Sequence, residues 1–271
     1  MEMQEYFAQV DSAYVTLSGP DLEQRLQALL EQSRTEYGAE SRLSVAMLSE
    51  LGAYYRGQGR YEDSVSCFRQ ALELLRRTGG ESSPDYATAT NNLAGTYRLM
   101  GRYDEAETAY TECLRRYRET LGETHVLYAS ALNNLGLLSL DRGDLPRAAQ
   151  LLAKASAVLS LHPECTDEFA TSLCNLGALY QKLGRLEEAR ERLLQAADLY
   201  ETKLGTATPH YHATLNSLGL VYYQSGLYGE AVDCLERASA AAQALYGPDH
   251  RECQAIAKHL QAARQAMGGT L

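Results

Sequence analysis

A glycine recurs at nearly constant spacing through most of this 271-residue chain. Successive members of the series are 42, 42, 41 and 42 residues apart, and they are Gly59, Gly101, Gly143, Gly184 and Gly226. A fixed period of this length is typical of repeat architectures, in which each unit packs only on its neighbours. The sequence therefore predicts an array of five similar units.

Other small residues accompany each glycine at fixed offsets. Seven residues earlier, after a leucine, lie Gly52, Ala94, Gly136, Gly177 and Gly219, and five residues later lie Ser64, Ala106, Ala148, Ala189 and Ala231. Apolar residues three and four apart on both flanks indicate two amphipathic helices. The glycine between them can adopt the left-handed conformation that ends a helix. Each unit is therefore predicted to be a helical hairpin whose helices cross closely at the small residues.

The motif within each unit resembles a known repeat. A tyrosine follows the small residue by three positions at Tyr55, Tyr97, Tyr180 and Tyr222, and Leu-Gly-x-x-Tyr followed by alanine resembles the tetratricopeptide repeat. The 42-residue period and connectors such as "LGETHVLYASALNNL" from residue 121 are similar to the kinesin light chain family. Over roughly residues 41–267, this resemblance implies an all-α, right-handed superhelical solenoid of tetratricopeptide hairpins. It does not imply binding to a motor protein, because the sequence lacks the heptad segment through which a light chain of this family pairs with a motor heavy chain.

Three regions are expected along the chain. Residues 1–40 are predicted to form a degenerate hairpin, residues 41–250 the five repeats, and residues 251–271 a capping helix with a short tail. Stacked arrays need such caps to cover their terminal apolar faces. The face of the final helix that should cover the fifth repeat consists of Cys253, Ile256, Ala257, Leu260 and Ala263.

Composition and motifs exclude several functions. The net charge of −10, without a basic run, argues against nucleic acid. No stretch approaches the ~20 apolar residues of a membrane span, and the acidic start does not resemble a secretory signal. Six cysteines without a CxxC pair suit reduced thiols, so we expect a cytoplasmic protein. No motif of an enzyme or cofactor site is found, and neither a catalytic residue, a cofactor, a metal nor a small-molecule substrate is expected.

Three weaker signals receive structural interpretations. His210 and His212 lack an evident third metal ligand, and His162 near Cys165 lacks the scaffold of a catalytic thiol. The aromatic residues near the start of successive first helices are better explained by packing between hairpins than by stacking of a ligand; they are Tyr86, Tyr128, Phe169 and Tyr211.

Asparagines recur on the first helix of successive hairpins. With the small residue after leucine counted as position eight, position five holds Ser49, Asn91, Asn133, Cys174 and Asn216, and position six includes Asn92, Asn134 and Asn175. A carboxamide both donates and accepts, so it can bind a peptide backbone. The resemblance implies that Asn91, Asn133 and Asn216 match asparagines that contact cargo peptides. Position six is predicted to be structural, and position five stays open between packing and binding.

These positions define a predicted groove. Small residues at positions two and nine leave room for an extended peptide, whose acidic side chains Arg56 and Arg98 would bind. Leu137, Leu140, Leu220 and Tyr223 would form an apolar wall. The predicted groove residues are Arg56, Asn91, Arg98, Asn133, Leu137, Gln181, Asn216, Leu220 and Tyr223. The predicted function is a non-enzymatic module that binds a peptide segment of a protein partner; the alternative is an assembly scaffold that uses its outer surface or ends.

Overall fold

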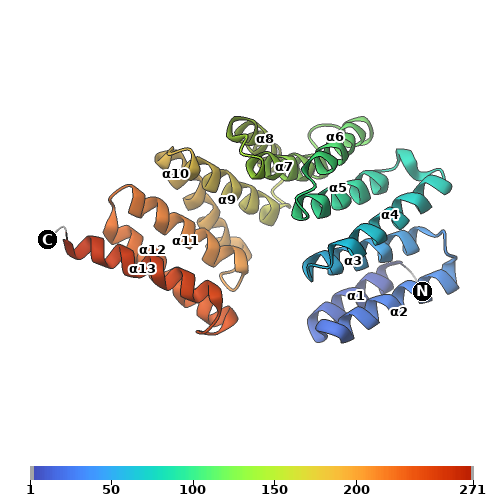
Figure 1. Ribbon diagram of the computed structural model, residues 1–271, viewed down its shortest axis with the longest axis horizontal. Coiled ribbons are helices and arrows are strands. Elements are labelled where there is room, and N and C mark those ends of the chain that lie inside the picture. Colours follow the sequence, from blue (N-terminus) through green and yellow to red (C-terminus); the bar gives the residue numbers. More distant parts are fainter. Residues whose placement is uncertain (1–2, 270–271) are drawn as a thin grey trace. The chain divides into compact units, whose positions relative to one another are not determined.

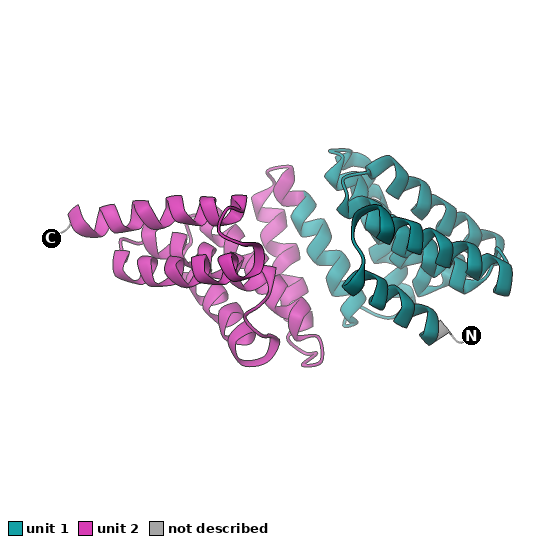
Figure 2. Cartoon of the chain, turned by 90° about the horizontal axis from the view of Figure 1, so that it is seen from below, with its two compact units in different colours: residues 1–138 teal, residues 139–271 magenta. Residues whose placement is uncertain are grey.

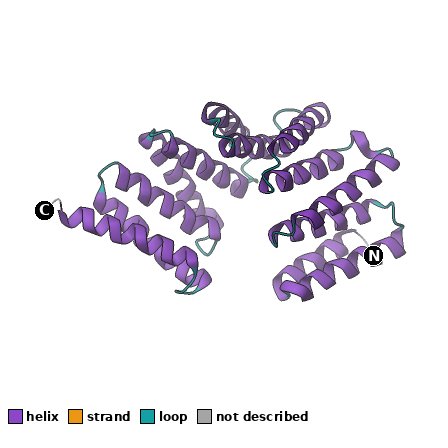
Figure 3. Cartoon of the chain, in the orientation of Figure 1, coloured by secondary structure: helices purple, strands orange, loops and turns teal. Residues whose placement is uncertain are grey.

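A computed structural model describes residues 3–269 of the chain. The chain divides into two compact units at residue 138, and the described parts of the units are residues 3–138 and 139–269 (Figure 2). Within the described residues, the regular elements are all helical and no strand is present (Figure 3). The predicted all-α fold of stacked hairpins is confirmed. No helix between residues 3 and 269 combines the length and the apolar character that crossing a membrane requires.

Unit 1 contains the first hairpins (Figure 1). Its helices are α1 (Met3–Thr16), α2 (Gly19–Tyr37), α3 (Arg42–Gly57), α4 (Tyr61–Arg77), a 3-10 turn (Gly80–Ser82), α5 (Pro84–Leu99), α6 (Tyr103–Thr120) and most of α7 (Val126–Asp141). Unit 2 contains α8 (Leu145–Leu159), α9 (Thr166–Lys182), α10 (Leu186–Leu199), a π-helical turn (Tyr200–Leu204), α11 (Pro209–Gln224), α12 (Tyr228–Tyr246) and α13 (Arg251–Gly269).

The repeated glycine ends the first helix of each hairpin, as predicted. Gly59 follows α3 with φ +73°, and the other four glycines of the series have φ between +72° and +79°. The backbone N–H of Gly59 bonds to the carbonyl of Arg56 at 3.1 Å, and that of Arg60 to the carbonyl of Tyr55 at 2.9 Å. These two bonds form a Schellman cap, which needs a left-handed residue at Gly59.

The helices of a hairpin cross closely at the small residues. A Cβ atom added to Gly219 on α11 would lie 2.6 Å from Cγ of Leu235 on α12, and one added to Gly177 would lie 2.6 Å from Cγ of Leu193. Real Cβ atoms do not approach other carbons this closely. The predicted role of the small residues at these two crossings is confirmed.

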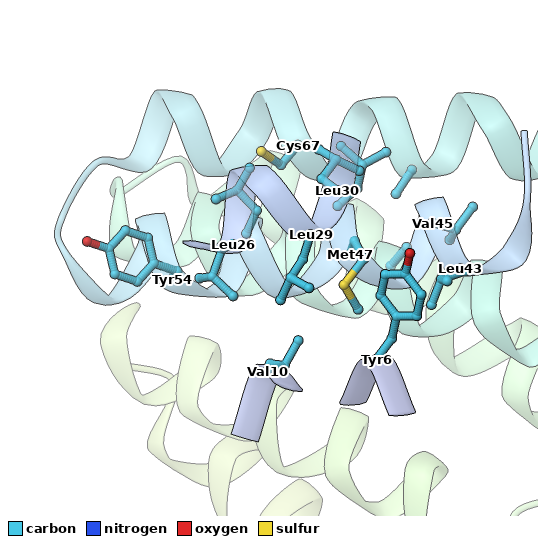
Figure 4. Packing of buried hydrophobic residues seen from close by; sticks show 14 of the residues in the cluster. Tyr6, Val10, Leu26, Leu29, Leu30, Leu43, Val45, Met47, Tyr54 and Cys67 are labelled. Carbon is cyan, nitrogen blue, oxygen red and sulfur yellow. The ribbon is translucent and has the colours of Figure 1, made fainter. Parts of the chain in front are cut away.

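The first hairpin packs on the second through a shared core (Figure 4). Tyr6 and Val10 of α1, Leu29 of α2 and Met47 of α3 are at most 2% exposed. Burial of each such side chain contributes about 1.5–3 kcal/mol, so α1 and α2 are held to the repeats by ordinary hydrophobic packing.

Helix α13 packs against the last hairpin in unit 2. Cys253, Ile256 and Ala263 are at most 3% exposed and Leu260 is partly buried, whereas Ala257 is exposed. The predicted face is therefore wrong at Ala257, because a helix turns about 100° per residue and this position falls at the edge of the buried stripe. Residues 270 and 271 of the predicted tail lie outside the described residues.

Candidate functional site

A pocket opens on the first helices of the hairpins in unit 1. It has a volume of about 290 Å³ and lies between α1, α3 and α5. Its apolar lining is Phe7, Val45, Ala46 and Ala53, and its polar lining includes Ser49, Glu50, Thr88 and Asn92. Burial raises the pKa of the Glu50 carboxyl, and the charge of Asp11 raises it further. We call this space the first-helix pocket.

Arg56 lies beside this pocket, at the end of α3. Its Nη1 donates to the backbone carbonyl of Asn92 at 3.3 Å, and its guanidinium carbon lies 6.0 Å from the ring centroid of Phe68. The side chain is half-buried, and no carboxylate of residues 3–269 pairs with it. Burial lowers the pKa of Arg56 below its ordinary value; the Tyr110 hydroxyl opposes this shift and the charge of Arg98 adds to it.

Two arginines and a tyrosine meet around Gly95. A Cβ atom at Gly95 would lie 3.2 Å from Nη1 of Arg56 and 3.5 Å from the Tyr110 hydroxyl oxygen. Arg98, one helical turn further along α5, forms a side-chain hydrogen bond with Tyr110. Burial raises the pKa of Tyr110 to about 12, although both arginines act in the opposite direction, so the hydroxyl stays protonated at neutral pH. We call Arg56, Arg98 and Tyr110 the arginine cluster.

The asparagines of unit 1 join neighbouring repeats. Asn134 Nδ2 on α7 donates to Asn91 Oδ1 on α5 at 3.2 Å. The position-six residue of one repeat thus binds the position-five residue of the repeat before it. The Asn91 oxygen is used within the stack, while its amide nitrogen can still donate to a ligand. Asn133 and Leu137 are half-buried on α7.

The remaining predicted groove residues lie in unit 2. Asn216 Oδ1 on α11 is 2.9 Å from Nδ1 of His259 on α13, and Gln181 Nε2 on α9 donates to Gln224 Oε1 at 3.3 Å. The Tyr223 ring is 37% exposed and Leu220 is half-buried, as is Leu140. The predicted residues therefore form two sets, one on each unit.

The histidines and the cysteine singled out in the sequence have the following surroundings. Among residues 3–269, no group of three or more histidine, cysteine or acidic residues is placed to hold a metal ion. His162 Nδ1 lies 3.0 Å from Glu164 Oε1, and burial raises the pKa of the Cys165 thiol, opposite to the activation of a nucleophile.

Three of the four aromatic residues at the starts of first helices are buried in the stack of hairpins, whereas Phe169 is half-buried. Tyr86, Tyr128 and Tyr211 are at most 8% exposed. Their hydroxyls accept hydrogen bonds from arginines at distances of 2.9–3.3 Å. The donors to Tyr86 and Tyr128 are Arg76 and Arg118 of the preceding helices, and the donor to Tyr211 is Arg237 of the following helix, α12.

Phe7, Glu50 and Tyr110 are not among the site residues predicted from the sequence. Phe7 belongs to the degenerate first hairpin, where no repeat motif marks the inner positions. Tyr110 has a sequence signal, because it occupies the position of Phe68, Leu193 and Leu235 in other repeats. A hydroxyl at a position otherwise filled by apolar side chains indicates a local polar partner.

The chain is similar to known repeat proteins. The tetratricopeptide repeat family pattern matches residues 43–119, 85–160, 168–244 and 210–269. Protein KINESIN LIGHT CHAIN-RELATED 3 of Arabidopsis thaliana is 24% identical over 166 residues, which cover 59% of this chain and only 18% of that protein.

Solved structures show the same fold. BtubC (BKLC) from P. vanneervenii is 22% identical, with a TM-score of 0.65 over 91% of this chain and 95% of its own. A putative kinesin light chain of Podosopora anserina with nearly identical TPR-like repeats is 22% identical, with a TM-score of 0.59 over 74% and 96%. Yeast Tom70 is 14% identical, with a TM-score of 0.68 over 98% and 47%. The family pattern covers most of the chain, and the stacked hairpins, capping glycines and close helix crossings of the structure agree with it. The chain therefore belongs to the tetratricopeptide repeat family, whose fold implies a protein–protein interaction module.

Proposed function

We propose that the first-helix surface of unit 1 binds an extended peptide that carries an acidic side chain. The observation that carries the proposal is Arg56, a half-buried guanidinium that has no carboxylate partner among residues 3–269 and lies near a second arginine, Arg98. Partial burial of a cation beside a like charge is unfavourable. A ligand carboxylate would offset this cost, and the planar fork of arginine suits a carboxylate well.

The neighbouring groups suit the rest of such a ligand. The amide of Asn91 can donate to a peptide carbonyl, and Asn133 is proposed to make the same contact one repeat later. The first-helix pocket, with Phe7, Val45 and Ala53 on its walls, would take an apolar side chain of the peptide. In unit 2, the second set of residues would hold a further segment; this set is Gln181, Asn216, Leu220 and Tyr223.

The proposed activity is binding alone, without catalysis or a cofactor. The expected partner is a protein or peptide, and neither nucleic acid, membrane nor a small-molecule substrate is part of the proposal. The cytoplasm is the proposed location, and the six free cysteines, four of them buried, support it.

The test uses a peptide selected from a random display library by the wild-type protein. Its affinity is measured by calorimetry for the wild type, for Arg56→Gln with Arg98→Gln, and for Asn91→Ala with Asn133→Ala. The matched control is Arg115→Gln, an exposed arginine on α6 that pairs with Glu112 and Glu119.

We expect the arginine double variant to bind at least tenfold more weakly, which corresponds to about 1.4 kcal/mol, and the control to bind as the wild type does. A second peptide has its acidic residues replaced by their amides. It should bind the wild type as weakly as the acidic peptide binds the arginine double variant, and its affinity for the double variant should be no lower than its affinity for the wild type. Folded variants that bind as tightly as the wild type would show that this surface is not the binding site and would favour the scaffold alternative.

A further inference from the structure

A second groove lies in unit 2 and is lined by residues of α10, α11 and α12. It has a volume of about 600 Å³. Its floor is largely apolar and includes Leu194, Ala197, Leu215, Leu218 and Tyr222. Its sides carry the carboxylates of Asp198, Glu201, Glu230 and Asp233. We call this space the α10/α12 groove.

The only cation that lines the α10/α12 groove within the described residues is already engaged. Arg237 forms an ion pair with Glu201 and donates to the Tyr211 hydroxyl at 2.9 Å. By contrast, the described part of the chain supplies no ion-pair partner for Asp198, Glu230 or Asp233. The groove thus combines the exposed side chain of Leu194 and the half-buried ring of Tyr222 with three unpaired negative charges, a combination that suits an apolar and basic ligand.

The repeat structure allows this groove to be compared with the equivalent space in unit 1. Unit 1 has the equivalent space between α4 and α6, above α5, with a volume of about 450 Å³. Corresponding residues are 125 positions apart, so Tyr97 matches Tyr222 and Glu105 matches Glu230. Three arginines of unit 1 have uncharged or acidic counterparts in unit 2: Arg69 matches Leu194, Arg76 matches Glu201, and Arg116 matches Ala241.

In unit 1, the chain's own arginines bind the side chains of this space. Arg69 Nη2 donates to the Tyr97 hydroxyl at 2.9 Å, and Arg76 Nη2 donates to the Tyr86 hydroxyl at 3.2 Å. The Arg116 guanidinium lies 4.4 Å from the centroid of the Tyr86 ring, within the range of a cation–π contact. The repeat framework therefore accepts guanidinium groups at this place.

Unit 2 keeps only part of these contacts, because Arg237 donates to Tyr211 as Arg76 does to Tyr86, whereas the contact made by Arg69 is missing. No residue of the range 3–269 forms a hydrogen bond with the Tyr222 hydroxyl, and Leu194 is 45% exposed where Arg69 would lie. Arg190, whose charge acts on Tyr222, is paired with Glu187. An arginine from outside the chain could occupy the position that Arg69 fills in unit 1, with Asp233 in place of the neutral Thr108 beside it.

We propose that the α10/α12 groove binds a basic, amphipathic segment of a protein partner. An arginine of the segment donates to the Tyr222 hydroxyl and pairs with Asp233, and its apolar side chains cover Leu194 and the floor beside Ala197. None of the residues that line this groove is among those proposed to bind the acidic peptide, so the two ligands do not compete for the same residues.

The experiment uses three 14-residue probe peptides with leucines on one helical face and arginine, lysine or glutamine on the other. Their affinities are measured for the wild type and for Leu194→Arg with Asp233→Thr, which rebuilds the residues of unit 1. The control is Glu191→Arg, which makes the same charge change of +2 on an exposed residue of α10 outside the groove.

We expect the arginine probe to bind the wild type more tightly than the glutamine probe, and to lose at least tenfold in affinity in the rebuilt variant but less than threefold in the control. Equal losses in both variants would mean non-specific charge attraction and would overturn the proposal, as would failure of the arginine probe to bind the wild type.

A reciprocal variant tests the same idea without relying on the fold of unit 2. Arg69→Leu with Thr108→Asp gives unit 1 the corresponding residues of the open groove and should create a second site for the arginine probe. Hydrogen exchange should show protection of residues 103–112 only in this variant, and of residues 228–237 in the wild type. Protection confined to the first-helix residues 42–57 and 84–99 would overturn the proposal.

Discussion

Asn134 donates a hydrogen bond from its amide nitrogen to the side-chain oxygen of Asn91, 43 residues earlier, at 3.2 Å. The same relationship recurs in unit 2, where Asn216 lies 2.9 Å from Nδ1 of His259, again 43 residues away. A carboxamide suits this place because it can accept from one neighbour and donate to another group. Recurrent asparagine therefore has a role in joining repeats, in addition to the ligand contact proposed for Asn91.

This pair should be energetically coupled. In a double-mutant cycle of Asn91→Ala and Asn134→Ala, we expect a coupling free energy of about 0.5–1.5 kcal/mol, the net value of one hydrogen bond. Urea unfolding of the wild type, both single variants and the double variant measures it. Strictly additive losses would show that the contact contributes nothing to stability.

A methyl group at the helix crossing should destabilise unit 2. Gly219→Ala would place Cβ 2.6 Å from Leu235 Cγ, and we expect a loss of about 1–3 kcal/mol from overpacking. Gly229→Ala on α12 is the matched control, because no atom lies within 4 Å of its added Cβ. Alanine is also the better helix former, so the control should be neutral or slightly stabilising. Thermal unfolding that ranks the two variants in reverse would contradict the close crossing.

Mild acid should destabilise unit 2 through His212. The imidazole is 5% exposed, and neither ring nitrogen has a hydrogen-bond partner among the described residues. Burial lowers its pKa; Glu252 opposes the shift, and His210 and His250 add to it. The Tyr246 ring packs edge-on against it, with centroids 5.4 Å apart.

Because the pKa of His212 is lower in the folded state, the unfolded chain binds more protons once the pH falls through about 6.5. Stability should therefore be unaffected by His212 above about pH 7.5 and decrease below 6.5, by at most about 1.4 kcal/mol per pH unit. The decrease ends below the folded-state pKa. Urea titrations of the wild type and His212→Leu between pH 7.5 and 5.5 measure this, and the same pH dependence in both proteins would exclude His212 as its source.

Removal of residues 251–271 should loosen the last hairpin first. The deletion exposes the faces of α11 and α12 that Cys253, Ile256 and Ala263 cover, and loss of a terminal interface acts locally in a repeat array. Hydrogen exchange should become faster in residues 209–246. Residues 42–57 of unit 1 serve as the internal reference, and equal acceleration in both regions would indicate global rather than local destabilisation.

The sequence was sufficient to predict the hairpins because their signals are local. A glycine such as Gly59 ends a helix through its own φ angle, and a glycine such as Gly219 is required by one neighbouring helix. Contacts between repeats are less accessible to such reasoning. Asn91 and Asn134 occupy different positions of the repeat, so a position-by-position comparison does not pair them.

The candidate surfaces depend even more on the tertiary structure. Phe7 enters the first-helix pocket from a hairpin without the repeat motif, and the Tyr110 hydroxyl reaches Arg98 from the second helix. The α10/α12 groove differs from the equivalent space of unit 1 in that Leu194 stands where unit 1 has an arginine. This difference is visible in the aligned repeats, but the groove beside it is defined only once α10, α11 and α12 are placed together.

The 43-residue separation of Asn91 and Asn134 also bears on how the chain reaches its native state. Each such bond closes a loop about one repeat long, and the entropy lost on closure depends on this length rather than on the total chain length. A hairpin therefore needs only its immediate neighbour to acquire its partners. Additional repeats would extend the array without increasing the sequence separation over which each hairpin must find its partner. Nascent hairpins could therefore pair while the rest of the polypeptide is still being synthesised.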